Sequence, residues 1–386
     1  MNGAQPMPDL AARMDRETGL GSSGLRRVVL VGPLPPPSGG MANQTRQLAR
    51  LLGERGVQVR LVQSNPPYRP AWIGHVRGLR ALFRLMPYLA ALWRALRHAD
   101  IAHVMANSGW AWHLFAAPAI WLAWLRGVAV LVNYRGGEAD EFLKRQVRWV
   151  RPTLRLARVL AVPSGYLQSV FARYGIAAEI VPNVVDLARF SPAPGRTPGR
   201  HIVVTRNLEP IYDISTALRA LAKVRVRFRD ARLTVAGSGP ELESLQRLAR
   251  ELGIADAVRF TGRLDNDEIA ALYREADLLL NPSTVDNMPN SLLEAMASGV
   301  PIVSTNVGGV PYLVEHERTA LLVPARDADA MAAAAIRILE DAGLRDRIVA
   351  AALNACRAYS WACVQPQLFA AYARCAGGPT LRESAS

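Results

Sequence analysis

The chain has 386 residues, half of them hydrophobic, and a formal net charge of +14 at pH 7. Its length has room for two domains of ordinary size, and its composition is that of a globular protein rather than a disordered one. The longest strongly apolar run, Leu114 to Leu125, contains Pro118 and is short for a membrane span of about 20 residues, so we expect a buried helix there.

The two ends of the chain carry weaker signals. Residues 1–24 are polar and contain no apolar run, which predicts a disordered leader rather than a signal peptide. Cys356, Cys363 and Cys375 have spacings unlike those of a metal site, and three is an odd number for a disulfide framework. A reducing, cytoplasmic setting is therefore expected.

Positive charge is concentrated in the N-terminal half. Residues 1–190 carry 24 Lys and Arg against 10 Asp and Glu, whereas residues 191–386 carry 22 against 22. The arginines are spread through helical segments without an aromatic-interleaved strand or a recognition helix, which argues against nucleic-acid binding. We expect the basic half to face an anionic membrane surface or a lipid phosphate.

The N-terminal half alternates strands and helices. Apolar strands are predicted at residues 28–31, 57–62, 101–105, 128–132 and 159–162. This alternation predicts an α/β domain with a parallel sheet over residues 25–190. The first strand leads into Gly39 and Gly40, whose backbone N–H groups could approach a phosphate at the start of a helix; the alternative is a simple turn.

Two further segments of this half are candidate surfaces. Residues 72–98 predict a helix with several arginines on one face and apolar residues elsewhere, which fits either peripheral membrane contact or a core helix with a solvated arginine face. His103 and Asn107 lie near the carboxyl end of a predicted strand, where they could line a pocket. A buried, hydrogen-bonded histidine is the alternative for His103.

A proline- and glycine-rich linker at residues 192–199 separates this half from a second series of elements. Strands are predicted at residues 201–205, 232–236, 258–261, 276–280 and 300–304, which places a second doubly wound domain at residues 200–360. Helices are predicted at residues 328–339, 344–359 and 361–376. Asp265 and Asp327 begin Asp-x-Asp sequences just before helices, where capping is favoured over metal binding.

Residues 281–309 gather acids and amides where strand, loop and helix meet. Their order predicts a β-loop-α-β unit, with the loop and the helix start at the carboxyl end of the strands, where ligands bind. Glu294, one turn into the helix, could accept hydrogen bonds from a ribose diol, and Asp286 could do the same for a sugar hydroxyl. An anion such as a diphosphate would meet the backbone N–H groups of Asn290, Ser291 and Leu292.

This unit resembles the donor-site motif of glycosyltransferase family 4. Asp286 and Glu294, with seven residues between them and AMASGVPIVST and a Gly-Gly pair after them, stand at the acidic positions of a motif that is usually Glu-x7-Glu. The resemblance implies that Glu294 holds the nucleotide ribose and that Asp286 contacts the donor sugar. It runs from about Arg26 to Cys375 and implies the GT-B architecture, in which two Rossmann-like domains flank a cleft and a terminal helix, here residues 361–376, crosses back to the first domain.

Other site residues are implied by the same resemblance. Gly39 and Gly40 stand where the family places a glycine-rich loop against the donor diphosphate, and Arg206 stands where the family neutralises that group. The acceptor side of the site is expected at His103, Asn107 and Glu138. Further donor contacts, several of them through the main chain, are expected at Gly237, Gly262, Arg263, Leu264, Asn287 and Asn290.

Three departures from the family pattern stand out. The lysine expected about five residues after Arg206 is missing, and Ile211 or Tyr212 occupies its place. Losing one preorganised donor at a developing anion can cost about 10²–10³ in rate. Arg135 replaces a family histidine, and we hypothesise that it supplies the missing cation. Pro289 interrupts a run that is usually glycine-rich and removes one N–H.

The sequence thus predicts a retaining glycosyltransferase that moves a sugar from a nucleoside diphosphate to an acceptor hydroxyl, with no metal or other cofactor. Its expected setting is polysaccharide or glycolipid synthesis in the cytoplasm or at the inner face of the membrane, with a sugar or a lipid-linked molecule as acceptor. Two alternatives stay open. One is an epimerase or hydrolase of nucleotide sugars, and the other is a catalytically degenerate binding protein, which the absent lysine makes conceivable.

Overall fold

The computed structural model describes residues 26–36, 39–67, 79–195, 198–377 and 381. The chain forms two compact units. Unit 1 comprises residues 1–163, 168–181 and 364–386, and unit 2 comprises residues 164–167 and 182–363. The first stretch of unit 1 therefore ends near residue 181, earlier than the predicted domain boundary at residue 190. The terminal helix belongs to unit 1 from Val364 onward. The leader expected at residues 1–24 lies outside the described residues.

Unit 1 is built on a six-stranded sheet in which all neighbouring strands are parallel. The spatial order is β2-β1-β3-β4-β5-β6. The strands are β1 (Arg27–Gly32), β2 (Gln58–Gln63), β3 (Ile101–Ala106), β4 (Ala129–Tyr134), β5 (Val159–Val162) and β6 (Glu179–Ile180). The predicted parallel sheet is confirmed. The edge strand β6 was not predicted, because two residues do not make a readable apolar run.

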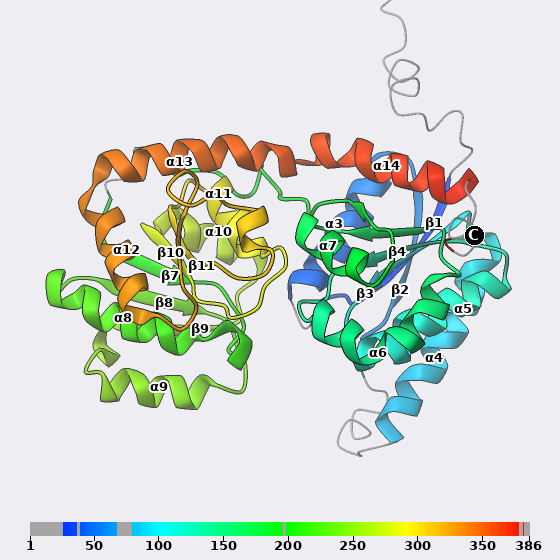
Figure 1. Cartoon of the computed structure of the whole chain (residues 1–386), viewed down its shortest axis with the longest axis horizontal. Coiled ribbons are helices and arrows are strands. Elements are labelled where there is room, and N and C mark those ends of the chain that lie inside the picture. The colour runs from blue at the N-terminus through cyan, green and yellow to red at the C-terminus, as the bar shows by residue number, and fades with distance from the viewer. Residues whose placement is uncertain (1–25, 37–38, 68–78, 196–197, 378–380, 382–386) are drawn as a thin grey trace, which may run out of the picture. The chain divides into compact units, whose positions relative to one another are not determined.

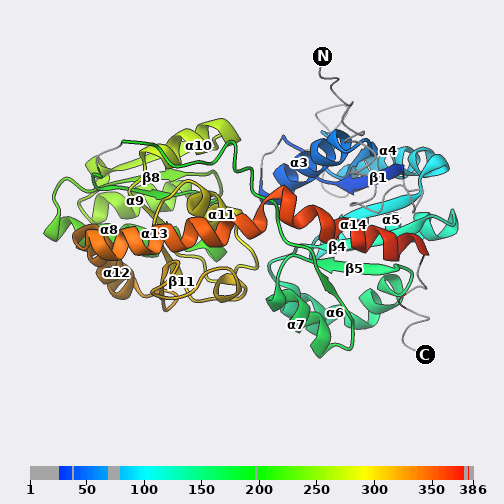
Figure 2. The ribbon, with the colours of Figure 1, turned by 90° about the horizontal axis from the view of Figure 1, so that it is seen from above.

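Helices cover both faces of this sheet. They are α3 (Gly40–Glu54), α4 (Leu79–Ala95), α5 (Ala117–Leu125), α6 (Ala139–Leu154), α7 (Gly165–Arg173) and α14 (Trp361–Gly377). A 3₁₀ turn, Leu96–His98, follows α4, and a π-helical turn, Trp112–Ala116, runs into α5. Figure 1 shows α14 over one face of the sheet and α4, α5 and α6 over the other, and the view from above places α14 in front of β4 (Figure 2).

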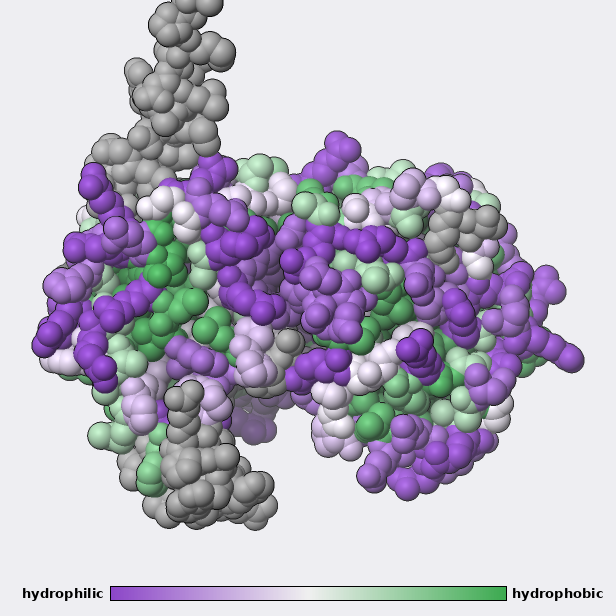
Figure 3. Space-filling model, turned by 180° about the vertical axis from the view of Figure 1, so that it is seen from behind, coloured by the Kyte–Doolittle hydropathy of each residue, from purple (hydrophilic) through white to green (hydrophobic). Residues whose placement is uncertain are grey.

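The helix expected to be buried at residues 114–125 is exposed along one side. Its inner side chains, including Ile120, are buried, but Trp121, Trp124 and Leu125 are 42%, 47% and 62% exposed. A helix that lies on a sheet buries one stripe, and a continuous apolar run gives no sign of which side faces water. Figure 3, a view from behind, shows hydrophobic residues that reach the surface among hydrophilic ones. Among the described residues, no helix is long and apolar enough to cross a membrane.

The last helix is fixed to unit 1 by polar contacts with distant parts of the chain. The buried Tyr372 places its hydroxyl 2.7 Å from Nδ1 of His103 in β3. Arg374 forms an ion pair with Glu179 in the edge strand β6. Arg158 donates hydrogen bonds to two backbone carbonyls near the end of α14. The helix is therefore an integral part of the fold of unit 1.

Unit 2 repeats the same plan with a second six-stranded parallel sheet in the order β12-β11-β10-β7-β8-β9. Its strands are β7 (His201–Val204), β8 (Arg232–Ala236), β9 (Val258–Gly262), β10 (Leu278–Asn281), β11 (Ile302–Thr305) and β12 (Leu321–Val323). Its helices are α8 (Ile214–Arg227), α9 (Leu242–Glu251), α10 (Asn266–Glu275), α11 (Asn290–Ala297), α12 (Ala328–Glu340) and α13 (Ala342–Cys356).

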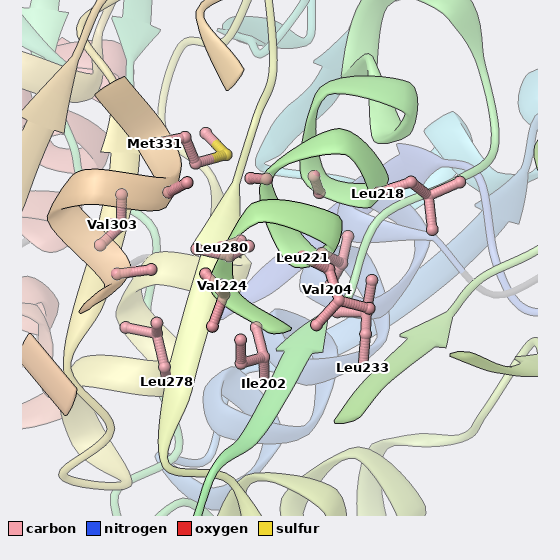
Figure 4. Packing of buried hydrophobic residues seen from close by; sticks show 14 of the residues in the cluster. Ile202, Val204, Leu218, Leu221, Val224, Leu233, Leu278, Leu280, Val303 and Met331 are labelled. Atoms are coloured by element: carbon pink, nitrogen blue, oxygen red, sulfur yellow. The ribbon is translucent and has the colours of Figure 1, made fainter. Parts of the chain in front are cut away.

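The core of unit 2 lies between the sheet and its helices. Figure 4 shows side chains of α8 and α12 packed over those of β7, β8, β10 and β11. Strands buried on both faces read as continuous apolar runs, which is why the sequence located most of them. This packing makes the sheet a rigid platform for the loops at its ends.

The two Asp-x-Asp sequences cap helices, as predicted. Asp265 accepts hydrogen bonds from the backbone N–H groups of residues 267 and 268, and the Glu268 side chain reciprocates in a capping box. Asp327 accepts from the N–H of Ala330 at 2.8 Å. Within the described residues, no group of three or more His, Cys, Asp or Glu side chains could hold a metal ion.

We expect Tyr372→Phe to lower the free energy of unfolding by about 1–3 kcal/mol, because a buried polar partner of His103 would be lost. Denaturant unfolding measures this change. Tyr312→Phe is the matched control, since Tyr312 is 56% exposed in unit 2, and it should stay within about 0.5 kcal/mol of the unsubstituted chain. Equal effects of the two substitutions would contradict a structural role for the bond between His103 and Tyr372.

Candidate functional site

The predicted donor-site residues of unit 2 gather at one edge of its sheet. Because the strands are parallel, the loops after β7, β8, β9 and β10 all begin at the carboxyl edge. Arg206 follows β7, Gly237 follows β8, Gly262 ends β9, and residues 282–289 connect β10 to α11. The fold therefore brings together side chains that lie far apart in the sequence.

A buried ion pair lies at this edge. The guanidinium of Arg206 contacts the carboxylate of Asp286, and the two side chains are 12% and 10% exposed. Burial raises the pKa of Asp286, and the charge of Arg206 opposes that shift. Nε of Arg206 is buried and has no hydrogen-bond partner among the described residues. This cation therefore keeps one donor that an anionic ligand could satisfy.

Glu294 lies on α11 within the field of the same cation. Burial raises its pKa to about 8, while the charges of Arg206 and Arg189 oppose the shift. In the part of the chain that the structure describes, its carboxyl group has neither a hydrogen bond nor an ion pair. Hydroxyl groups of a ligand would stabilise the ionised form and lower this pKa.

The start of α11 is held by contacts within unit 2. Asn183 donates hydrogen bonds from Nδ2 to Oδ1 of Asn290 at 2.7 Å and to a neighbouring backbone carbonyl. Leu292 was expected to offer its N–H to an anion, but that N–H donates to the carbonyl of Pro289 at 3.2 Å. The expectation that this N–H is unpaired is therefore wrong, and contact of Leu292 with a ligand stays a prediction. Ser291 has a buried Oγ without a hydrogen-bond partner among the described residues, so it retains polar capacity at the helix start.

The Gly-Gly pair of the motif supports the backbone that carries Asp286. A Cβ at Gly308 would lie 2.1 Å from the carbonyl oxygen of Asp286, and a Cβ at Gly309 would lie 1.7 Å from that of Asn287. The N–H of Gly309 donates to the carbonyl of Asp286 at 2.8 Å. Asn287 is buried, and its N–H donates to the Asp286 carboxylate at 3.1 Å. Only glycine allows this close approach of the two loops.

The loops after β8 and β9 touch each other. Gly237 and Gly262 form an antiparallel bridge, and Gly262 has a left-handed φ of +72°. A Cβ at Gly237 would lie 1.9 Å from the carbonyl oxygen of Arg206. Arg263 is exposed and Leu264 is half-buried. The two loops expected to border the nucleotide base therefore lie together, one of them against Arg206, and base contact itself stays a prediction.

Two family models match the chain, one in each half. The model described as Glycosyltransferase Family 4 matches residues 38–189, and the model described as Glycosyl transferases group 1 matches residues 199–341. The chain belongs to glycosyltransferase family 4. The family resemblance inferred from Asp286, Glu294 and the Gly-Gly pair is confirmed.

Curated relatives of this chain are named as sugar transferases. The GDP-mannose-dependent α-(1-6)-phosphatidylinositol monomannoside mannosyltransferase of Mycobacterium tuberculosis is 36% identical over 214 residues, which cover 50% of this chain and 54% of that protein. The MMP α-(1→4)-mannosyltransferase of Mycolicibacterium hassiacum is 31% identical over 237 residues, 60% of this chain and 56% of that protein. The chain spans about half the length of the curated relatives it matches.

Solved structures share the fold at low sequence identity. Sucrose-phosphate synthase from Thermosynechococcus elongatus has a TM-score of 0.73 at 20% identity, with 90% of this chain and 98% of that chain covered. Anabaena HepE in complex with UDP and glucose has a TM-score of 0.69 at 17% identity, with coverages of 89% and 98%. The predicted GT-B fold class of this family 4 chain is confirmed.

Tyr212 is one of the two residues at the place of the lysine expected in family 4. It ends a 3₁₀ turn, Pro210–Tyr212, and Cζ of Arg206 lies 4.2 Å from the centroid of its ring. Thr284 donates hydrogen bonds from N and Oγ1 to the carbonyl of Ile211, at 2.8 and 3.0 Å, so the turn is tied to the loop that carries Asp286. The sequence shows that one cation is lost near this position. In the structure the ring of Tyr212 holds the remaining cation, Arg206, by a cation–π contact.

Two of the three expected acceptor-side residues lie at the carboxyl edge of the unit 1 sheet. Asn107 follows β3, and Glu138 precedes α6; both are exposed. A Cβ at Gly136 would lie 2.4 Å from Oγ of Ser108 and 2.7 Å from Oδ1 of Asn107, so the loops after β3 and β4 press together. The structure thus brings Asn107 close to the loop that carries Glu138, and their role toward an acceptor stays a prediction.

Arg135 ends a line of hydrogen bonds that enters the core of unit 1. Its Nε donates to Oδ1 of Asn133 at 3.1 Å, and Nδ2 of Asn133 lies 3.2 Å from Nε2 of His103. Arg135 thereby orients the amide, so Nε2 of His103 accepts and Nδ1 carries the hydrogen that is donated to Tyr372. Burial, with a smaller effect of the Arg135 charge, lowers the pKa of His103 to about 3 and keeps its ring neutral.

This network favours the buried alternative for His103, because both ring nitrogens are bonded inside the core. Burial lowers the pKa of Arg135 to about 10, which leaves the guanidinium charged at neutral pH. Its expected role as a substitute cation stays a prediction.

The glycine loop of unit 1 lies just before α3. Gly39 has an extended backbone, with φ of −173°, and a Cβ there would meet no atom within 4 Å. Packing around the described residues therefore does not require glycine at position 39. Gly40 is exposed at the first residue of α3. Contact of either residue with a diphosphate stays a prediction.

We expect Gly309→Ala to lower the free energy of unfolding of unit 2 by about 1–3 kcal/mol, because its Cβ would collide with the carbonyl oxygen of Asn287. Gly137→Ala is the control, since a Cβ there meets no atom within 4 Å, and it should change stability by less than about 0.5 kcal/mol. Denaturant unfolding of both variants measures the difference. A Gly309→Ala chain as stable as the control would contradict the close approach of these loops.

We expect the stability of the unsubstituted chain, relative to Glu294→Gln, to fall as the pH rises from 5 to 9. The unfolded carboxyl releases its proton near its ordinary pKa of 4.5, whereas the folded one holds it until about pH 8, so ionisation favours unfolding between these values. The loss in the free energy of unfolding should reach about a few kcal/mol and should level off above pH 8. Unfolding free energies at several pH values measure it, and identical pH profiles for the two chains would contradict it.

Proposed function

We propose that this chain is a retaining glycosyltransferase that moves a sugar from a nucleoside diphosphate to an acceptor hydroxyl without a metal ion. The observation that carries the proposal is the group formed by Arg206, Asp286 and Glu294 at the carboxyl edge of the unit 2 sheet, beside the start of α11. A cation, a helix N-terminus and two carboxyl groups in one buried place suit a nucleoside diphosphate better than a neutral metabolite.

Each group has a role in this proposal. Arg206 and the start of α11 stabilise the departing diphosphate, because fixed donors in a dry site are worth more than the same donors in water. Asp286 accepts a hydrogen bond from a donor sugar hydroxyl, and Glu294 accepts from the ribose diol. The reaction breaks the bond between the anomeric carbon and the phosphate oxygen, and it forms a bond to the acceptor oxygen on the same face. The acceptor proton leaves with the diphosphate.

Binding of the donor rearranges the charges of the site. In the chain without donor, Arg206 is paired with Asp286. A diphosphate would share this guanidinium, with its partnerless Nε as the first new donor, and Asp286 would turn to the sugar. Tyr212 keeps Arg206 in place during the exchange, since its ring contact does not depend on Asp286.

The names of the relatives and the charge of the chain support a proposal for the acceptor class. Relatives are named for phosphatidylinositol monomannoside as acceptor, and HepE was crystallised with UDP and glucose. For this chain we propose a sugar or lipid-linked acceptor of polysaccharide or glycolipid synthesis, met at the cytoplasmic face of a membrane. Peripheral membrane contact through residues 72–98 is part of this proposal, and residues 72–78 of that segment lie outside the described residues.

A nucleotide panel tests the donor site. Calorimetry and thermal shift with UDP, GDP, ADP and dTDP should find one nucleotide that binds and stabilises the chain, and Glu294→Ala should weaken its binding at least about tenfold. Because a ribose diol lowers the pKa of Glu294, binding near pH 7 should release a fraction of a proton, seen as a dependence of the binding enthalpy on the buffer. Glu294→Gln should abolish this release.

Turnover assays then separate the proposal from its rivals. Release of free sugar, or its isomerisation, without acceptor would identify a hydrolase or an epimerase. Absence of binding for all four nucleotides would contradict the donor site and favour the degenerate binding protein that the missing lysine makes conceivable.

A further inference from the structure

The outer sides of α4 and α5 carry an apolar surface that the donor site does not use. On α4 the exposed residues Phe83, Met86, Ala90 and Trp93 follow at spacings of three and four, which place them on one stripe of the helix. Tyr88 and Leu92, between them, point the other way and are buried. With the exposed residues of α5 they form what we call the α4–α5 face, consisting of Phe83, Met86, Ala90, Trp93, Trp121, Trp124 and Leu125.

The two helices form one continuous surface. α4 packs beside α5 in unit 1 (Figure 1). Arg126, directly after α5, donates to the carbonyl of Trp93 at 3.1 Å and places Cζ 3.7 Å from the centroid of the Trp93 ring. Trp121 and Trp124 meet edge to face with centroids 5.8 Å apart, and Nε1 of Trp121 donates to Thr153 of α6 at 3.1 Å. The rings are therefore ordered by contacts within the fold although they reach the solvent.

The surroundings of this face are cationic. Residues 79–98 and 110–126 contain five arginines and neither Asp nor Glu. Arg94 and Arg97 are exposed. Tryptophan and arginine favour the zone where lipid headgroups meet acyl chains, and each basic residue near an anionic surface adds about 1 kcal/mol of binding. A symmetric contact with a second copy of the chain would instead bring these arginines together without acidic partners.

We propose that the α4–α5 face docks on the surface of an anionic lipid bilayer, with the two helices lying against it. The functional reason for this docking rests on the proposed function, since docking would bring the transferase to a lipid-linked acceptor. α4 leads through Leu96–His98 into the start of β3, so its last turn lies at the amino edge of the sheet and its first turn toward the carboxyl edge. Docking along α4 therefore keeps the carboxyl edge, with Asn107 and Glu138, beside the membrane.

Vesicle sedimentation of the full chain tests the face. The chain should bind vesicles of phosphatidylcholine with phosphatidylglycerol, bind phosphatidylcholine alone more weakly, and lose affinity as salt is raised. Trp124→Glu and Met86→Glu should each reduce the partition coefficient at least about tenfold, because each buries a charge in the headgroup zone and removes apolar area. Val226→Glu is the control with the same added charge, since Val226 is 85% exposed on α8 of unit 2, and it should bind like the unsubstituted chain.

Several outcomes would overturn the proposal. One is absence of vesicle binding at low salt, and another is equal binding by Trp124→Glu, Val226→Glu and the unsubstituted chain. A dimer in analytical ultracentrifugation that Trp124→Glu dissociates, together with absence of vesicle binding, would assign the face to a second copy. Nucleotide binding and circular dichroism of the same variants keep the docking proposal separate from the transferase proposal. A folded variant that still binds nucleotide but no longer binds vesicles supports docking through the α4–α5 face, whatever sugar the chain transfers.

Discussion

The buried contact between Arg206 and Asp286 is the interaction on which the site of unit 2 depends. A guanidinium and a carboxylate that leave water together each need the other, because an unpaired buried charge costs several kcal/mol. The two residues come from the loops after β7 and β10, which are neighbours in the sheet. Their pairing therefore fixes two loops relative to one another, and the glycines at 308 and 309 allow a third loop to pack against the backbone that carries Asp286.

The same cation also acts on Glu294, so one positive charge stands near two acidic groups. The two carboxyls differ because Asp286 has a direct partner, while Glu294 feels Arg206 and Arg189 only through space. If both carboxyl groups were ionised, the negative charges would outnumber the one nearby positive charge of Arg206. The neutral form of Glu294 limits this imbalance at moderate pH. In unit 1 the buried His103 is neutral instead, and its hydrogen bonds with Asn133 and Tyr372 place the single ring proton on Nδ1.

Much of this arrangement could be predicted from the sequence. Buried parallel strands read as apolar runs. Asp286, Glu294 and the two glycines form a local pattern whose spacing indicates the donor-site motif of family 4. Tyr212 could not be recognised, because its stacking on Arg206 depends on a turn tied to residue 284, far along the chain. The link from Arg135 to Tyr372 was missed for the same reason. The exposed tryptophans of α5 were misjudged because an unbroken apolar run has no period that tells inside from outside.

The attachment of α14 to β3 has a consequence for how the protein is made. Unit 2 is almost continuous in sequence, from residue 182 to residue 363, whereas unit 1 needs residues from both ends of the chain. His103 and Tyr372 are separated by 269 positions, so on the ribosome the core of unit 1 must wait for the final helix while unit 2 can already close. Until α14 has been synthesised, β3 and its neighbours lack this cover, and in this interval a nascent chain would most need a chaperone.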